Sequence, residues 1–173
     1  SIYGITRFGM DTRAMLIYFI LAQFTSILGS VVFGWLTDKS GVKLSLNISL
    51  MIWVAVVFWA FFCSSAKEYY FVGLLAGLAI GSSQANSRTM LSMLTPVDRE
   101  AEFFGFYTLT GRLSSIIGPI LYGWIAHRAG DIRYSILTLI LFFSAGLIAL
   151  QFVDPNKGFA DARLAITPNR EEK

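Results

Sequence analysis

The sequence predicts an all-α membrane protein whose chain crosses the bilayer five times. Hydrophobic residues make up 55% of the 173 residues and charged residues only 14%, against about 25% charged in a typical soluble domain. The charged residues gather in short turns between long apolar runs. Five of these runs reach the roughly 20 residues that a helix needs to cross a bilayer. Lipid is therefore the predicted surrounding of most of the chain, and an integral, multi-pass membrane location follows.

The five apolar runs are separated by short turns. They cover residues 14–36, 44–63, 69–94, 103–126 and 134–153. Connections this short predict that consecutive helices lie antiparallel to one another. Residues 154–173 are polar, of mixed charge and interrupted by proline and glycine, a composition typical of a flexible end. The sequence thus predicts a transmembrane unit over residues 1–153 and a flexible cytoplasmic tail over residues 154–173.

Polar side chains divide the five predicted spans into two kinds. The second and fifth spans are almost entirely apolar, and we expect them at the periphery, facing lipid. The other three spans each carry a polar stripe at helical spacing, which predicts a face toward water, a ligand or another helix. The stripes are formed by Gln23, Ser26 and Ser30 in the first span, Gln84, Arg88 and Ser92 in the third, and Thr108, Arg112 and Ser115 in the fourth.

Two of these polar residues are arginines in otherwise apolar surroundings. Arg112 lies near the middle of its span, where a cation costs on the order of 3 kcal/mol. Arg88 lies nearer the end of its span, so its side chain can partly reach the membrane interface. No Asp or Glu occurs within the five runs. Each arginine therefore needs a partner from elsewhere, because an unpaired buried cation is strongly unfavourable.

The residues predicted to form a ligand-binding wall are Arg112, Arg88, Gln84, Thr108, Ser115 and Gln23. Cationic and hydrogen-bonding groups of this kind suit a carboxylate or a zwitterion. For the two arginines the alternative is a structural role, in which backbone carbonyls or a carboxylate of another segment hold the guanidinium. For Gln84 a hydrogen bond to a neighbouring helix fits equally well.

Several classes of function lack the residues that they need. The single Cys63 and the single His127 cannot make a metal site of known spacing, and they lack the pattern of a hydrolase. No glycine-rich phosphate loop is present, so we expect neither an ATP-driven pump, nor an enzyme, nor a bound cofactor. The net charge of +3 is spread over turns and tail, which predicts no nucleic-acid partner.

The turn after the first span reads GWLTDKSGVK, residues 34–43. Gly34 permits the close approach of a neighbouring helix. Asp38 is an acid at a helix exit, where it can interact with the N-terminus of another helix. Gly41 supplies the tight turn.

Two lysines of the same turn, Lys39 and Lys43, indicate a cytoplasmic loop. Because the turn lies at the membrane edge, we expect a conformational role for its residues and no contact with a ligand. The expected partner is the start of the fourth span, where Glu100 and Glu102 lie.

The spacing of this turn resembles motif A of the major facilitator superfamily, G-x-L-x-D-[RK]-x-G-x-[RK]. Two later stretches resemble the vacuole-effluxer-like branch of that superfamily, also called the unknown major facilitator family, with its patterns G-x-x-Q-A-x-S-R and E-F-F-G-F-Y-x-x-x-G-[KR]. The matching residues are Gly81, Gln84, Ala85, Ser87 and Arg88, then Glu102, Phe103, Phe104, Gly105, Phe106, Tyr107, Gly111 and Arg112, followed by Gly118 and Pro119. The resemblance covers about residues 2–153.

This resemblance implies a major facilitator fold in which the five spans correspond to helices eight to twelve. Helix seven and the N-terminal half then lie outside the chain, and we expect them as a partner in the same or a separate chain. The spans matching helices eight, ten and eleven would line the central cavity, and those matching nine and twelve would pack outside. The polar stripes predict the same division.

The function implied by the resemblance is secondary active transport of a small anionic or zwitterionic solute by alternating access. The branch includes a fungal vacuolar amino-acid effluxer, so amino-acid efflux is the implied activity. The membrane would be the plasma membrane in a bacterium and the vacuolar membrane in a fungus. The alternative is a truncated or split-gene membrane module without transport activity of its own.

Overall fold

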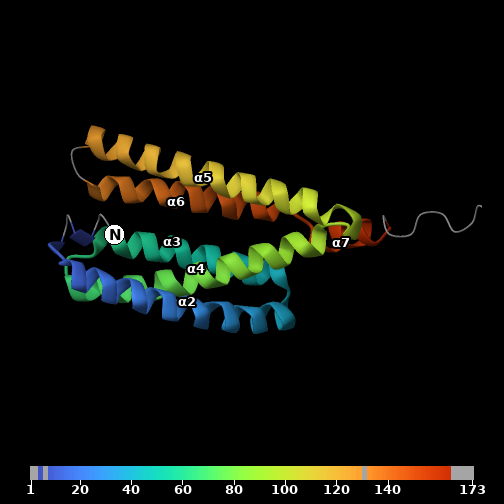
Figure 1. Ribbon diagram of the computed structural model, residues 1–173, viewed down its shortest axis with the longest axis horizontal. Coiled ribbons are helices and arrows are strands. Elements are labelled where there is room, and N and C mark those ends of the chain that lie inside the picture. Colours follow the sequence, from blue (N-terminus) through green and yellow to red (C-terminus); the bar gives the residue numbers. More distant parts are fainter. Residues whose placement is uncertain (1–3, 6–7, 130–131, 165–173) are drawn as a thin grey trace, which may run out of the picture.

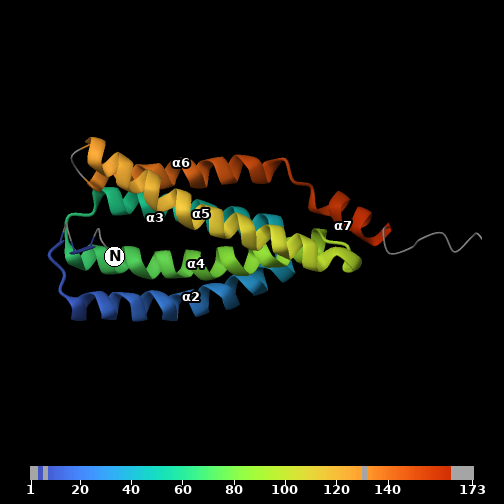
Figure 2. The ribbon, with the colours of Figure 1, turned by 45° about the horizontal axis from the view of Figure 1, so that its top comes forward.

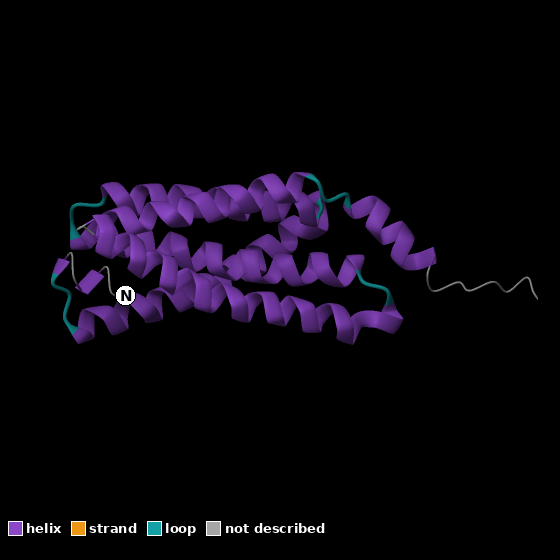
Figure 3. Ribbon diagram, turned by 90° about the horizontal axis from the view of Figure 1, so that it is seen from above, coloured by secondary structure: helices purple, strands orange, loops and turns teal. Residues whose placement is uncertain are grey.

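A computed structural model describes residues 4–5, 8–129 and 132–164, and within them the chain is helical and has no strand (Figure 3). The helices overlap the five predicted apolar runs in order and add one more at the end. They are α2 (Thr12–Ser40), α3 (Val42–Phe62), α4 (Ala66–Leu94), the 3₁₀ turn η1 (Val97–Arg99), α5 (Glu100–Ala129), α6 (Ile132–Gln151) and α7 (Pro155–Leu164).

Local signals decide where the first helices end and begin. Gly41 separates α2 from α3 with a φ of 88°, a backbone region that is costly for any residue with a Cβ. This confirms the predicted tight turn. At the start of α4 the Ser65 hydroxyl accepts the backbone N–H of Lys67 at 3.3 Å, and the Glu68 carboxylate accepts the backbone N–H of Ser64 at 3.1 Å. The first bond satisfies a donor that the first turn of a helix leaves free, and the second holds the residue before the N-cap against the first turn.

Helices α2 and α4 pack together through glycines of α4. A Cβ built at Gly77 would collide with the carbonyl oxygen of Ala22 and the hydroxyl of Thr25. A Cβ at Gly81 would collide with the carbonyl oxygen of Ser26. Small residues at a helix interface allow two backbones to approach closely, which is the main way that helices gain contact in lipid.

The five long helices pack in the spatial order α2, α4, α3, α6, α5, which differs from their order in the chain. In Figure 1, α2 lies at the bottom, α3 and α4 in the middle, and the α5–α6 hairpin along the top. Figure 2 shows the same helices running along one common axis, with α7 beyond one end. Because α5 barely contacts α4, the hairpin is held to the other helices mainly by α6 packing on α3.

Two clusters of buried apolar side chains stabilise this arrangement, one near each end of the bundle. The larger cluster joins α2, α3, α4, α6 and the residues before α2. It consists of Met10, Met15, Val56, Val57, Ala60, Cys63, Tyr69, Val72 and Ile136. The smaller cluster, at the other end, consists of Val42, Leu46, Met90 and Leu150.

Among the described residues, α2 and α3 are long and apolar enough to cross a membrane by length and composition. Only 17% of the most apolar window of α2 is buried inside the chain. A helix with so much exposed apolar surface needs lipid or another protein segment around it. In α6 the described apolar stretch is the shorter Thr138–Gln151. The polar stripes of α4 and α5 lower their mean hydropathy, so five membrane crossings stay a prediction.

Two features differ from the sequence-based expectations. The segment after Val153, expected to be flexible, forms α7 over Pro155–Leu164 and packs on the end of α4, where a Cβ at Gly158 would collide with Leu94. Residues 165–173 of the predicted tail lie outside the described residues. The second predicted span, α3, is not simply peripheral. It lies between α4 and α6 and buries two hydroxyls, Ser45 and Ser49.

Candidate functional site

A polar cavity lies between α2 and α4. Its volume is about 270 Å³, and its polar lining comes from Gln84 and Arg88 of α4 and from Ser26 and Ser30 of α2. The close packing at Gly81 brings the two helices together beside it. Gln84 and Arg88 are exposed at the open side of this cavity. The structure therefore brings together two of the predicted binding residues and adds two serines from the facing helix.

The two serines were visible in the sequence only as members of a polar stripe. Ser30 Oγ donates to the carbonyl of Ile27 at 2.8 Å, so its hydroxyl oxygen is still able to accept a hydrogen bond. The stripe did not indicate that Ser26 and Ser30 face Gln84 and Arg88, because that contact depends on how α2 docks on α4. Gln23, the third residue of the stripe, is exposed and does not line this cavity.

Arg112 and Thr108 lie in a separate hollow on α5. The hollow is open, has a volume of about 550 Å³, and is lined by residues of α5 alone: Phe104, Gly105, Thr108, Leu109 and Arg112. Ser115, one turn further, donates its hydroxyl hydrogen to the carbonyl of Arg112 at 2.7 Å. Thr108 donates to the carbonyl of Phe104 at 2.8 Å. Within the described residues, Arg88 and Arg112 thus belong to two polar faces on different helices.

A hydrogen bond joins the two helices that carry these faces. The hydroxyls of Ser87 on α4 and Tyr107 on α5 lie 2.9 Å apart. Ser87 lies three residues after Gln84 and directly before Arg88 on α4. Tyr107 lies directly before Thr108 on α5. The link therefore lies beside both polar faces and fixes the distance between the two helices near the predicted binding residues.

The turn of residues 34–43 has a different set of contacts from the one expected. A Cβ at Gly34 would meet nothing within 4 Å, whereas a Cβ at Gly29 would collide with the backbone of Leu78. The close helix approach in this part of α2 therefore occurs at Gly29. Asp38 and Glu102 are exposed. Within residues 4–5, 8–129 and 132–164, no ion pair or hydrogen bond joins Glu102 to any residue of the turn, Asp38 included.

The two lysines of the turn have separate partners. Lys39 Nζ lies 3.9 Å from the ring centroid of Trp35, one turn earlier on α2, a cation–π contact. Lys43 Nζ donates to the backbone carbonyls of Gln151 at 3.0 Å and of Val153 at 2.6 Å. Lys43 thus caps the C-terminal end of α6, where carbonyls lack helical partners and a cation is favourable. No pattern in the sequence indicated this contact, because its residues lie more than a hundred positions apart in the chain.

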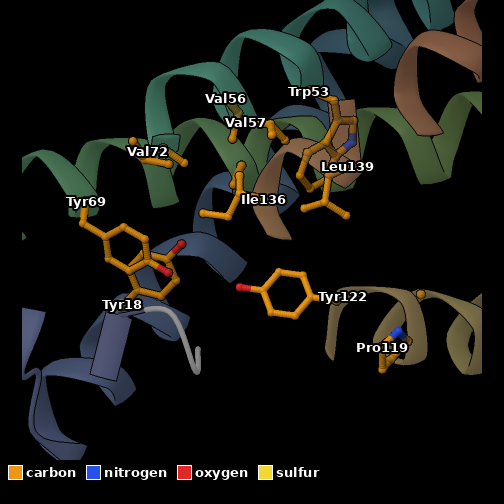
Figure 4. Close-up of a pocket in the computed structure, with 13 residues that line it drawn as sticks. Tyr18, Trp53, Val56, Val57, Tyr69, Val72, Pro119, Tyr122, Ile136 and Leu139 are labelled. Atoms are coloured by element: carbon orange, nitrogen blue, oxygen red, sulfur yellow. The ribbon is translucent and has the colours of Figure 1, made fainter. Parts of the chain in front are cut away.

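A third cavity, of about 510 Å³, is mainly apolar and opens between the α5–α6 hairpin and the other helices. Figure 4 shows Tyr18 stacked on Tyr69, with the hydroxyl of Tyr122 pointing toward them across the space. The rings of Tyr18 and Tyr69 are nearly parallel, with centroids 4.9 Å apart. Trp53 and Pro119 also line the cavity. None of the predicted binding residues lies here.

No group of three or more His, Cys, Asp or Glu side chains within the described part of the chain is placed to hold a metal ion. His127 is exposed near the end of α5, and Cys63 is buried at the end of α3. The arrangement of the polar groups offers a guanidinium, an amide and hydroxyls. Groups of these kinds are able to bind an anion or a carboxylate by charge-assisted hydrogen bonds.

Comparison with known proteins identifies the family. Residues 1–163 match the family described as vacuole effluxer Atg22 like. The chain belongs to this family. The patterns around Gln84, Arg88 and Arg112 predicted this assignment to the vacuole-effluxer-like branch of the major facilitator superfamily, and the match confirms it.

Individual relatives come from bacteria and fungi. The chain is 29% identical over 151 residues to the uncharacterized MFS-type transporter YxiO of Bacillus subtilis, with 87% of the chain and 35% of the relative covered. It is 35% identical over 96 residues to autophagy-related protein 22 of Kluyveromyces lactis, covering 56% of the chain and 20% of the relative. For autophagy-related protein 22 of Saccharomyces cerevisiae (strain S288c) the identity is 28%, covering 87% and 28%. The chain thus spans about a third or less of the length of the curated relatives it matches.

Proposed function

We propose that this chain forms part of a secondary active transporter for a small anionic or zwitterionic solute. The observation that carries the proposal is the cavity between α2 and α4, where Gln84 and Arg88 face Ser26 and Ser30. A cation, an amide and hydroxyls on otherwise apolar helices are costly in a membrane and are typically retained for a function. Membership of a family of MFS-type transporters and vacuole effluxers supports the same activity.

In this proposal Arg88 binds a carboxylate of the solute. Its guanidinium presents several N–H donors in a plane, which suits the two oxygens of a carboxylate. The side-chain amide of Gln84 donates a further hydrogen bond, and Ser26 and Ser30 accept hydrogen bonds from an ammonium group. Such a set of groups fits an amino acid, and the vacuole effluxers of the family make amino-acid efflux the activity to test first.

Arg112, with Thr108 and Ser115, forms a second polar wall on α5. This wall would lie across the solute pathway from the Gln84–Arg88 face, with the Ser87–Tyr107 hydrogen bond at its edge. Gln23 continues the polar stripe of α2. Alternating access would move this group of helices against the segments of the longer protein, with the turn of residues 34–43 at the cytoplasmic edge.

Other segments of a longer protein are the expected partner of this chain. The apolar surface of α2 lacks a cover within the described residues. So does the cavity between the α5–α6 hairpin and the other helices, called the aromatic cavity after Tyr18, Tyr69 and Tyr122 in its lining. A further apolar helix would cover them in the way that buried helix faces are covered in a bundle. The plasma membrane in a bacterium, or the vacuolar membrane in a fungus, is the proposed location.

The alternative is a membrane module that does not transport by itself, from a truncated or split gene. The small share of each relative that the chain covers favours testing this directly. Sequencing the transcript upstream of the codon for Ser1 separates the two. A continuous frame that encodes further apolar spans supports the transporter. A stop codon followed by a native start makes transport depend on a separate partner chain.

The decisive experiment uses the gene product that contains this chain, purified and reconstituted into liposomes. Uptake of radiolabelled amino acids and dicarboxylates is compared between the native protein and the Arg112→Ala variant. We expect transport of at least one of these solutes by the native protein and none by the variant, with both inserted in equal amounts. Equal transport by the two proteins would remove Arg112 from the pathway, and no transport by either would contradict the proposed solute class.

A further inference from the structure

The amide of Asn86 is the largest fully buried side chain among the described residues, with 1% of its surface exposed. It lies on α4, between Gln84 and Arg88, at a position that the family pattern G-x-x-Q-A-x-S-R leaves open. A buried amide is expensive unless each of its polar atoms has a partner. The hydrogen-bond partners of the Asn86 amide therefore indicate its role.

Both ends of the amide are hydrogen-bonded, and the partners lie on two other helices. Asn86 Oδ1 accepts from the hydroxyl of Thr37 on α2 at 2.8 Å. Asn86 Nδ2 donates to the hydroxyl of Ser45 on α3 at 2.8 Å and, more weakly, to that of Ser49 at 3.5 Å. A single side chain thus connects α4 with both α2 and α3.

The hydroxyl groups close this set into a ring. Ser45 Oγ donates its hydrogen to the backbone carbonyl of Phe33 at 3.1 Å, so it accepts from Asn86, which fixes the orientation of the amide. Ser49 Oγ donates to the carbonyl of Ser45 at 3.0 Å. Phe33 and Thr37 are one helical turn apart on α2. The ring therefore runs through three helices. The hydroxyls of Thr37, Ser45 and Ser49 each donate one hydrogen bond, and those of Ser45 and Ser49 also accept from Asn86.

The position of Asn86 on α4 relates this ring to the polar cavity. Gln84 and Arg88 are each two residues away, and two residues on an α-helix correspond to about 200° of rotation. The ring and the cavity are thus on nearly opposite sides of α4. On α2, Thr37 lies within the turn of residues 34–43 and directly precedes Asp38 and Lys39.

We infer that Asn86 is a positioning residue that fixes the register of α4 against the end of α2, so that the Gln84–Arg88 face and the turn of residues 34–43 move as one body. An apolar side chain at this position would fill the space but would allow α4 to rotate or slide past α2. The polar ring has one satisfied arrangement, so it selects one register. Only the description of Gln84 and Arg88 as a solute site rests on the proposed function; the register does not.

The experiment measures the register with spin labels on the gene product that contains this chain, in lipid nanodiscs. Nitroxides are attached at Ser40→Cys on the end of α2 and Ser92→Cys on α4, both exposed positions, in a background without other reactive cysteines. The distance distribution between the labels is compared for the native ring and for the variants Asn86→Leu, Thr37→Val and Thr37→Ser.

We expect a narrow distribution for the native ring and for Thr37→Ser, which keeps the hydroxyl. Asn86→Leu and Thr37→Val should raise the population of displaced distances about fivefold, the factor that corresponds to one net hydrogen bond. The matched control is Ser87→Ala, which breaks the bond to Tyr107 on α5 and leaves the ring intact. Native distributions for both Asn86→Leu and Thr37→Val would overturn the inference.

A second measurement separates positioning from mere stability. With a solute that the reconstituted protein transports, Thr37→Val should raise KM, because a shift of α4 against α2 displaces Gln84 and Arg88 from Ser26 and Ser30 across the cavity. Thr37→Ser should restore the native KM. A native KM for Thr37→Val, with only the amount of folded protein reduced, would contradict the positioning role. If no solute is transported, the proposed function fails, and the spin-label distances still decide the register.

Discussion

At the residue scale, Arg88 is the cation that the tertiary structure places in a cavity with polar groups from a second helix. We predict that Arg88→Ala raises the KM of carboxylate transport about 10- to 100-fold, since a hydrogen bond to a charged group contributes about 1.5–3 kcal/mol. The measurement is uptake into liposomes over a range of solute concentrations. Thr89→Ala is the matched control, because Thr89 is exposed and, within the described residues, its hydroxyl bonds to the carbonyl of Ala85 in its own helix and to no other helix.

The same experiment has a clear negative outcome. If Arg88→Ala and Thr89→Ala give the same KM, the guanidinium does not contact the solute. Arg88 would then be a structural arginine, the alternative that its position near the end of the predicted span allows.

Lys43 is the second residue whose role depends on a distant contact. Lys43→Met should lower the free energy of unfolding by about 1 kcal/mol, because the two carbonyls at the end of α6 lose a cationic partner. Thermal unfolding of the purified protein measures this effect. Lys39→Met serves as the control, since the cation–π contact of Lys39 is with Trp35 of its own helix and, within the described residues, Lys39 has no hydrogen bond to another helix. Equal stability of the two variants would show that the cap on Gln151 and Val153 contributes nothing.

At the element scale, the pair α2–α4 depends on glycine. Gly81→Ala should destabilise the protein by about 1–3 kcal/mol, since the added methyl group meets the carbonyl oxygen of Ser26 and the backbones must separate. Gly123→Ala on α5 is the control, because a Cβ there meets nothing within 4 Å. It should be neutral or stabilising by up to about 1 kcal/mol, as alanine favours the helix.

The separation of α2 from α4 in Gly81→Ala should also change the polar cavity between these helices, because Gly81 is part of its lining. Thermal unfolding gives the stability of both glycine variants, and a binding titration with a transported solute gives the effect on the site. A Gly81→Ala protein as stable as the Gly123→Ala protein would mean that α2 and α4 pack less closely than the structure has them.

At the scale of the whole molecule, the exposed apolar surface is the main feature that needs a partner. We predict that a cysteine at Leu139, in the aromatic cavity, reacts with a maleimide in the isolated 173-residue chain and is protected in the longer gene product. Leu139 is 37% exposed within the chain, and a covering helix would remove that exposure. The reaction is followed by mass spectrometry in detergent, with Cys63 replaced by serine.

Phe152→Cys provides the matched control for this labelling. Phe152 is 86% exposed at the end of α6 and should react in both proteins. Equal reaction of Leu139→Cys in the two proteins would show that the cavity stays open in the longer protein. It would then be a site for a lipid or another apolar ligand, and not a contact with further helices.

The sequence by itself determined the helices and the family. Long apolar runs with polar turns predict helices because each backbone group must find its partner locally in lipid, and α2 to α6 lie where those runs lie. The motif residues around Gln84 and Arg112 predicted the family that the match over residues 1–163 confirms. Gly41 was recognisable because its turn needs a positive φ.

Only the tertiary structure decided which faces meet. The ring around Asn86 and the cap by Lys43 join residues that are 49 and 110 positions apart in the chain. Ser30 and Arg88, which line one cavity, are also far apart in the sequence. Periodicity within one helix gives the direction of a stripe, but it carries no information about the helix that the stripe contacts. The spatial order α2, α4, α3, α6, α5 follows from side-chain fit between helices, such as the glycines of α4 against α2. For the same reason the separation of Arg88 from Arg112 into two polar faces was not predictable from their sequence spacing.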